Sequence, residues 1–243
     1  MSDQNQNQML DPLWMRRCAR AVLICLLGFV LLMGVAMALY PGGNWIDPQA
    51  PGHRFLSNFF CDLTQPVSLS GVTNRLGAGF ARFGMWCFAA ALAGFFWLVP
   101  LHFAPAPTLS SRAPLGRWVR GLGECAVLGV AAVPLLPSET FGHLHGFLAL
   151  TSGALGIVAA LVAVIALCRS SLAARRLGFL GALALAVASF DAALFAVHLN
   201  DVGPPPLLLP AAQKLAALLL CAWVIGVAWP LQAARERRAT RRP

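Results

Sequence analysis

The chain has 243 residues, of which 58% are apolar and only 11% are charged, and its formal net charge is +9. Soluble domains carry about 25% charged residues, so this composition excludes an ordinary soluble protein and indicates a membrane protein. The positive charge does not predict a nucleic-acid partner, because the basic residues stand in short clusters between apolar runs instead of forming one basic region.

Six apolar stretches predict six transmembrane helices, each with about the 20 residues that cross roughly 30 Å of hydrocarbon. In chain order they cover about residues 20–39, 80–101, 120–137, 147–168, 177–199 and 211–231. The third is the weakest, because Glu124 lies inside it and two prolines close it. The predicted fold is an all-α polytopic membrane protein, with a six-helix domain over residues 20–231. A cytoplasmic tail at 1–19, disordered over Met1–Asp11, and a basic tail at 232–243 flank this domain.

The basic residues predict the orientation, because short loops rich in Lys and Arg stay in the cytoplasm. Of the 18 basic residues, four fall on one side of the six spans and fourteen on the other. The four are Arg54, Arg75, Arg82 and Lys214. The fourteen are Arg16, Arg17, Arg20, Arg112, Arg117, Arg120, Arg169, Arg175, Arg176, Arg235, Arg237, Arg238, Arg241 and Arg242. We therefore expect both termini in the cytoplasm and the loop at 40–79 on the outer face of a bacterial inner membrane.

The first span also has features of a secretory signal peptide. Basic residues and an apolar run precede Ala36-Met37-Ala38, which fits an A-x-A cleavage pattern. The apolar run is longer than that of a usual signal peptide, so the prediction is a retained helix. Cleavage would leave five spans in the same orientation.

Residues 53–63 of the outer loop form an amphipathic pattern. The apolar positions, spaced i, i+1, i+4, i+5 and i+8, are Phe55, Leu56, Phe59, Phe60 and Leu63. This spacing predicts a short helix in the membrane interface. The helix is either a simple anchor with its aromatic side chains in lipid or a lid that forms part of a site.

Titratable residues gather on the predicted outer face. They are His53, His143, His145, His198, Asp62, Glu139, Asp191 and Asp201. Imidazole and carboxylate groups together suit a metal site or a proton-handling site. The candidate zinc ligands are His145, His198 and Asp191. However, His143 and His145 lack the i, i+4 spacing of a helical zinc pair.

Asp191 is the most informative single residue, since it lies about eight residues, or roughly 12 Å, inside the fifth span. A carboxylate at that depth costs a few kcal/mol, so it should face the bundle interior and have a partner. His198 lies two turns further along the same helix face, and Lys214 enters the sixth span at a comparable depth. Two interpretations stay open. Either an Asp191–Lys214 ion pair fixes helix packing, or Asp191 and His198 form the floor of a functional pocket.

Two other features of the spans favour packing roles. Glu124 lies one helical turn after Arg120, which predicts an ion pair between them near the cytoplasmic end of the third span. Small residues such as Gly153 and Gly156 permit close contact between helices.

Three segments together resemble a group of uncharacterised bacterial six-helix membrane proteins with a domain of unknown function. The segments are Tyr40-Pro41-Gly42-Gly43, Ser57-Asn58-Phe59-Phe60-Cys61-Asp62-Leu63, and Leu136-Pro137-Ser138-Glu139 followed by His145. That group is distantly similar to the Frag/DRAM/Sfk membrane family. The resemblance implies a six-helix fold and no particular reaction.

A second likeness is to the transmembrane hydrolases of the alkaline ceramidase and adiponectin-receptor superfamily, in which a zinc-bound water attacks an amide. Those enzymes combine Ser, Asp and three His near one membrane face, and the residues of the same types in this chain are Ser57, Asp62, His143, His145 and His198. This chain lacks the H-x-x-x-H pair of those enzymes and has six predicted spans instead of seven.

The leading hypothesis is a protein that binds a lipid or small amphiphile in an outer polar pocket, without a defined reaction. Its candidate binding residues are Ser57, Asn58, Asp62, Glu139, His143, His145, Asp191, His198 and Lys214. The alternative is a metal-dependent transmembrane hydrolase acting on a lipid amide or ester, with Asp62, Asp191 and His198 as catalytic candidates beside His145. A third alternative is a non-catalytic assembly subunit that forms homo-oligomers or binds another membrane protein.

Overall fold

The computed structural model describes residues 12–103, 113–199 and 208–233, and within these ranges the regular structure is helical. The long helices are α1 (Pro12–Leu39), α3 (Arg75–Leu98), α4 (Ala113–Ala132), α5 (Ser138–Cys168), α6 (Leu172–Leu199) and α7 (Leu208–Ala233). The short ones are α2 (Phe60–Leu63) and the 3₁₀ turns η1 (Val99–His102) and η2 (Val133–Leu135). The six long helices are long and apolar enough to cross a membrane, which confirms the predicted all-α fold with six spans.

Each long helix begins three to nine residues before its predicted span. Hydropathy marks the apolar run, whereas the backbone hydrogen bonds of a helix continue into flanking residues whose polar ends can reach water. The weak third span ends where expected, because Pro134 lies in η2 and Pro137 directly precedes α5. In the first span, the Ala36-Met37-Ala38 pattern lies inside α1, and Ala36 is buried.

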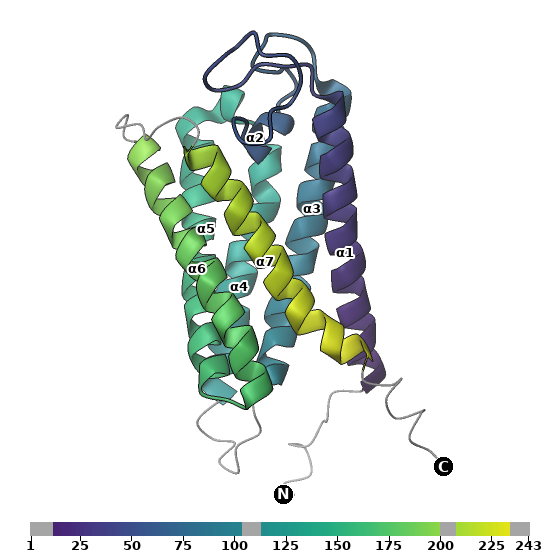
Figure 1. Ribbon diagram of the computed structural model, residues 1–243, viewed down its shortest axis with the longest axis vertical. Helices are drawn as coiled ribbons and strands as arrows, with labels where there is room; N and C mark the ends of the chain where they lie inside the picture. Colours follow the sequence, from purple (N-terminus) through teal and green to yellow (C-terminus); the bar gives the residue numbers. More distant parts are fainter. Residues whose placement is uncertain (1–11, 104–112, 200–207, 234–243) are drawn as a thin grey trace, which may run out of the picture.

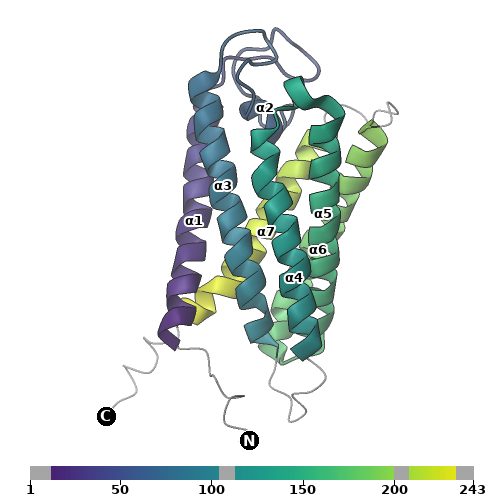
Figure 2. The same ribbon diagram turned by 180° about the vertical axis from the view of Figure 1, so that it is seen from behind.

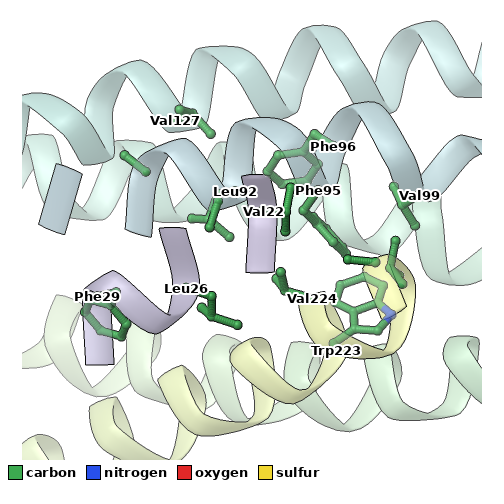
Figure 3. Close-up of a cluster of buried hydrophobic side chains, with 14 of the residues drawn as sticks. Val22, Leu26, Phe29, Leu92, Phe95, Phe96, Val99, Val127, Trp223 and Val224 are labelled. Carbon is green, nitrogen blue, oxygen red and sulfur yellow. The ribbon is translucent and has the colours of Figure 1, made fainter. Parts of the chain in front are cut away.

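The six long helices form a closed ring in chain order (Figures 1 and 2). Each packs against the next, and α7 returns to contact both α1 and α3. Figure 1 shows α7 running obliquely, from beside α6 at one end to the base of α1 at the other. An apolar core fills the space between α1, α3 and α7, where the Phe95 and Trp223 rings lie 4.8 Å apart (Figure 3).

The two ends of the bundle differ in composition. Residues 40–74 cover one end, which we call the loop end, while α1 begins and α7 finishes at the other, the arginine end (Figure 1). Basic residues at the arginine end are Arg16, Arg17, Arg20, Arg117, Arg120, Arg169, Arg175 and Arg176. The predicted one-sided distribution of arginines is thus present in the described part of the chain. Arg112, the five tail arginines, Asp201 and the Met1–Asp11 segment lie outside the described residues.

The helix predicted over residues 53–63 is confined to Phe60–Leu63. Side chains accept hydrogen bonds from backbone N–H groups in the preceding residues, and at Phe59 this hydrogen bond replaces the one that a helix would make. The Arg54 N–H donates to Asn58 Oδ1 at 2.9 Å, and the Phe59 N–H donates to Asp62 Oδ2 at 2.8 Å. The segment therefore turns at Asn58 and forms a single helical turn above the middle of the bundle (Figures 1 and 2).

The predicted Arg120–Glu124 ion pair is not formed. The Arg120 guanidinium lies over the Trp97 ring, 4.8 Å from its centroid, and so contacts α3. Arg120 Nε and Glu124 Oε1 are both buried without a hydrogen-bond partner.

Candidate functional site

A cavity of about 440 Å³ lies inside the helix ring and reaches the loop end. We call it the pocket. Its wall comes from α3 to α7, from α2 and from Trp45 of the loop, and α1 contributes nothing to it. Along α6 the wall runs from Ala184 to His198, which is roughly 21 Å at 1.5 Å per residue. The pocket therefore extends deep into the part of the bundle that would lie in hydrocarbon.

Its two long walls differ in side-chain size. The α5 wall presents small residues at helical spacing, namely Gly146, Ala149, Gly153, Gly156 and Ala160. The facing wall is aromatic and aliphatic, with Phe88, Leu92, Phe95, Phe96 and Trp223. A Cβ atom added to Gly153 would meet nothing within 4 Å, so this glycine leaves open space beside it. The result is a deep, apolar slot.

Polar groups line the pocket mainly near the loop end. They are Asp62, Ser138, His145, Asp191, His198 and Gln213. Ser152 lies deeper, but its hydroxyl donates to the Leu148 carbonyl of its own helix at 2.8 Å. The pocket is therefore amphipathic along its length, with a polar mouth and an apolar interior.

A break in α5 precedes His145. Gly142 has φ 43° and ψ −114°, a conformation that is open to glycine and strained for other residues. It separates the first turn of α5 from the long helix that starts at His143. That first turn is tied to the loop, because Gln65 Nε2 donates to Ser138 Oγ at 2.5 Å.

His145 presents an unpaired ring nitrogen, Nε2, at the pocket. The side chain is only 4% exposed, and its Nδ1 lies 2.6 Å from the Leu136 carbonyl oxygen. A carbonyl oxygen only accepts hydrogen bonds, so Nδ1 carries a proton, and in that tautomer of the neutral ring Nε2 is an acceptor. Within the described residues Nε2 has no hydrogen-bond partner.

Asp62 caps α2 with one oxygen and leaves the other free. Its Oδ2 accepts hydrogen bonds from the Phe59 N–H at 2.8 Å and from Asn58 Nδ2 at 3.2 Å. Burial raises the pKa of Asp62, which is 9% exposed, while those two hydrogen bonds and the charge of Lys214 act in the opposite direction. Oδ1 has no partner among the described residues, and Asp62 lines the pocket.

Lys214 holds the loop to α7. Its Nζ donates to the backbone carbonyl of Asn58 and lies 4.9 Å from the Phe60 ring centroid. Beside it, Gln213 Oε1 accepts the Phe60 N–H at 2.9 Å. Lys214 forms no direct ion pair with Asp191 in the described chain, and its charge acts on Asp62 and Asp191 through space. The predicted Asp191–Lys214 ion pair is thus replaced by a contact between helix and loop.

His198 and Trp45 form the rim of the pocket. Their rings meet edge to face with centroids 4.5 Å apart, and Phe59 packs on the other side of Trp45 at 6.1 Å. Asp191 lies two turns deeper in α6, in the wall and not at the floor of the pocket. The deep end is formed by residues such as Leu220 and Trp223.

Four of the nine predicted binding residues therefore line one cavity, and these are Asp62, His145, Asp191 and His198. The other five do not line it. Ser57 and Asn58 are buried in the loop, and Glu139 and His143 are exposed. Lys214 is buried and binds the Asn58 carbonyl in the turn before α2. His53 does not line the pocket either. Its ring meets that of Tyr40 edge to face, with the centroids 6.0 Å apart.

The four predicted outer histidines do not converge. In the part of the chain that the structure describes, no three His, Cys, Asp or Glu side chains lie close enough together to hold a metal ion. His145, His198 and Asp191 share the pocket, but they do not form a zinc-ligand set. Cys61 also lines the pocket, and burial together with Asp62 raises the pKa of its thiol to about 12, so it is protonated and a poor nucleophile.

The sequence reasoning missed three parts of the site. Trp45 and Gln213 lie in a loop and at a helix end without any distinctive motif. The small-residue stripe of α5 did carry a signal, because its members recur every three or four residues. We interpreted Gly153 and Gly156 as helix-contact residues, and both line the pocket, while Gly156 also faces Ala126 of α4.

No family model, curated protein or solved structure matches this chain.

Proposed function

We propose that this protein binds a lipid or small single-chain amphiphile in the pocket, with the apolar chain directed toward Trp223 and the polar head at the loop end. The observation that carries the proposal is the form of the cavity. It is a slot of about 440 Å³ whose polar groups gather at one end and whose remaining wall is almost entirely apolar. Ligand sites have volumes of about 300–1,000 Å³, mostly apolar walls and a few placed polar groups.

The walls favour an extended chain over a bulky ring system. On α5 and α6 half of the lining residues are Gly or Ala, and the opposing face is aromatic, so the space between them is long and narrow. An unbranched hydrocarbon chain fits such a space without displacing side chains. Most polar side chains of the lining lie near the mouth, where the head of an amphiphile would satisfy them. The deep end holds the Trp223 indole N–H, which is buried without a hydrogen-bond partner.

The proposal places the loop end outside the cytoplasm of a bacterial inner membrane and both termini inside it. The arginines gathered at the opposite end of the bundle support this orientation. The pocket mouth would then open toward the outer surface, and its ligand would come from the outer leaflet or the periplasmic side.

A hydrocarbon chain with a terminal bromine tests the proposal, because bromine quenches tryptophan fluorescence at short range. The full chain in phosphatidylcholine nanodiscs is titrated with 12-bromododecanol. We expect saturable quenching that is largely lost in Trp223→Phe. Quenching that does not saturate, or that is equal in Trp223→Phe, would show that the chain end does not reach Trp223 and would overturn the proposal.

Two glycine variants provide the matched control. Gly153→Leu places a side chain in the open space beside the pocket, so it should abolish the Trp223-dependent quenching. Gly34→Leu makes the same change in α1, where a Cβ also meets nothing within 4 Å but the residue does not line the pocket. The fluorescence of Gly34→Leu should be quenched by 12-bromododecanol to the same extent as that of the wild type.

A further inference from the structure

The charge of the pocket identifies the kind of head group it takes. Two carboxylates, Asp62 and Asp191, line it from α2 and α6. Among the described lining residues there is no Lys or Arg. A phosphate or carboxylate head would therefore meet like charge without a Lys or Arg in direct contact, and like charges repel more strongly where water is excluded.

Two of the four basic residues on the loop side of the bundle, Lys214 and Arg82, are already engaged. Lys214 is 1% exposed, donates to the Asn58 carbonyl and faces the Phe55 and Phe60 rings. Arg82 donates through Nε and Nη2 to the Thr64 carbonyl at 3.3 and 3.1 Å. Neither side chain lines the pocket, so neither is placed to receive an anionic head.

Hydrogen-bond acceptors in the pocket remain unpaired. Asp62 Oδ1 and His145 Nε2 belong to side chains that are at least nine-tenths buried, and neither atom has a partner in the described structure. Asp191 likewise accepts no hydrogen bond there. These unpaired atoms face the pocket, so a ligand that donates hydrogen bonds would complement them.

We infer that the amphiphile carries a protonated amine as its head, which binds Asp191 and Asp62 at the polar end of the pocket. This inference rests on the proposed function. An ammonium group has three N–H donors and a positive charge, so it complements a carboxylate by charge and can also donate to a neutral acceptor within hydrogen-bond distance of its nitrogen. A metal ion needs ligands gathered at one point, which the described residues do not supply.

The experiment compares three probes with the same brominated chain and different heads. They are 12-bromododecylammonium, 12-bromododecanoate and 12-bromododecanol, each titrated against the full chain in phosphatidylcholine nanodiscs at pH 7. Trp223-dependent quenching reports binding, with Trp223→Phe as background. We expect the ammonium to bind at least tenfold more tightly than the carboxylate, with the alcohol between them.

Asp191→Asn should bring the ammonium-to-carboxylate ratio close to one while the alcohol still binds. Glu139→Gln is the matched control, because it removes an exposed carboxylate at the same end of the bundle that does not line the pocket, and it should leave the ratio unchanged. Equal binding of the three probes, tighter binding of the carboxylate, or an unchanged ratio in Asp191→Asn would overturn the head-group inference and leave the proposed function standing. Absence of Trp223-dependent quenching by all three probes would overturn both.

Discussion

Lys214 shows how a buried cation can serve packing inside an apolar bundle. The side chain joins α7 to the turn before α2 through the Asn58 carbonyl, and two aromatic faces complete its surroundings. Asp191 contributes only through-space attraction. The two residues therefore have separate roles, Lys214 in holding the loop and Asp191 in lining the pocket.

Replacing each residue alone should reveal this separation. Lys214→Met removes the donor from a buried carbonyl and should destabilise the protein by about 1–3 kcal/mol. Asp191→Asn breaks no direct contact in the described structure and should cost less than about 1 kcal/mol. Unfolding by denaturant in detergent gives both values. In the double variant the two losses should add, and partial recovery of stability would instead indicate a coupled ion pair.

His53 should make the stability of the folded protein depend on pH. Burial, together with the charge of Lys214, lowers the pKa of His53 to about 4, whereas an unfolded histidine titrates near 6.5. Between these values the unfolded chain binds a proton that the folded protein does not. The stabilisation is therefore fully present above pH 6.5 and is lost as the pH falls toward 4.

The test compares thermal unfolding at pH 7 and pH 5. The wild type should lose about 1 kcal/mol more than His53→Gln between the two values, after allowance for the partial exposure of the ring. Asp62, with its raised pKa, changes stability in the opposite direction in both proteins, so the comparison isolates His53. An equal loss in both proteins would show that His53 is not the responsible group.

At the level of elements, α5 is broken at Gly142, a residue that lines the pocket. Gly142 has a positive φ angle that a side chain would strain, although a Cβ there would meet no other atom within 4 Å. Gly142→Ala should therefore destabilise the protein by about 1–3 kcal/mol through backbone strain alone.

Gly153→Ala is the control for this prediction, because the same helix carries the same added methyl group in equally open space. Its helical backbone suits alanine, so the variant should be neutral or more stable by up to about 1 kcal/mol. Both are measured by thermal unfolding of the full chain in detergent. If the two variants had equal stability, the strain at Gly142 would be refuted.

The elements also show what the sequence could predict. Long apolar runs predicted six helices because the free energy of burying about 20 apolar residues dominates any local preference. The helix expected over residues 53–63 was too long, since Asp62 accepts the Phe59 N–H that a longer helix would have used for its own backbone hydrogen bond. Periodicity alone does not report this competition between side chains and backbone.

The sequence predicted those site residues whose burial in a membrane span costs free energy. A carboxylate deep in a span must face the interior, and Asp191 lines the pocket as that argument requires. The partner of Lys214 was not predictable, because Asn58 lies 156 residues away in the chain and meets it only after the loop folds over the bundle. The same holds for Trp45 against His198.

At the scale of the whole molecule, the arginine end and the loop end predict opposite compartments. Alkaline phosphatase fused after Gly71 in the loop should be active, because the enzyme folds only outside the cytoplasm. Green fluorescent protein fused to the C-terminus should be fluorescent, because it folds inside. An inactive phosphatase together with a dark C-terminal fusion would reverse the orientation and move the pocket mouth to the cytoplasmic side.

The central claim is that the helix ring encloses a binding site for one amphiphile. The most direct measurement is native mass spectrometry of the protein released from its own membrane, with wild type, Gly153→Leu and Gly34→Leu compared under the same conditions. The account predicts a single bound amphiphile on the wild type and on Gly34→Leu, and its loss from Gly153→Leu. Wild-type protein without any such adduct, or adducts that are the same in all three proteins, would contradict it.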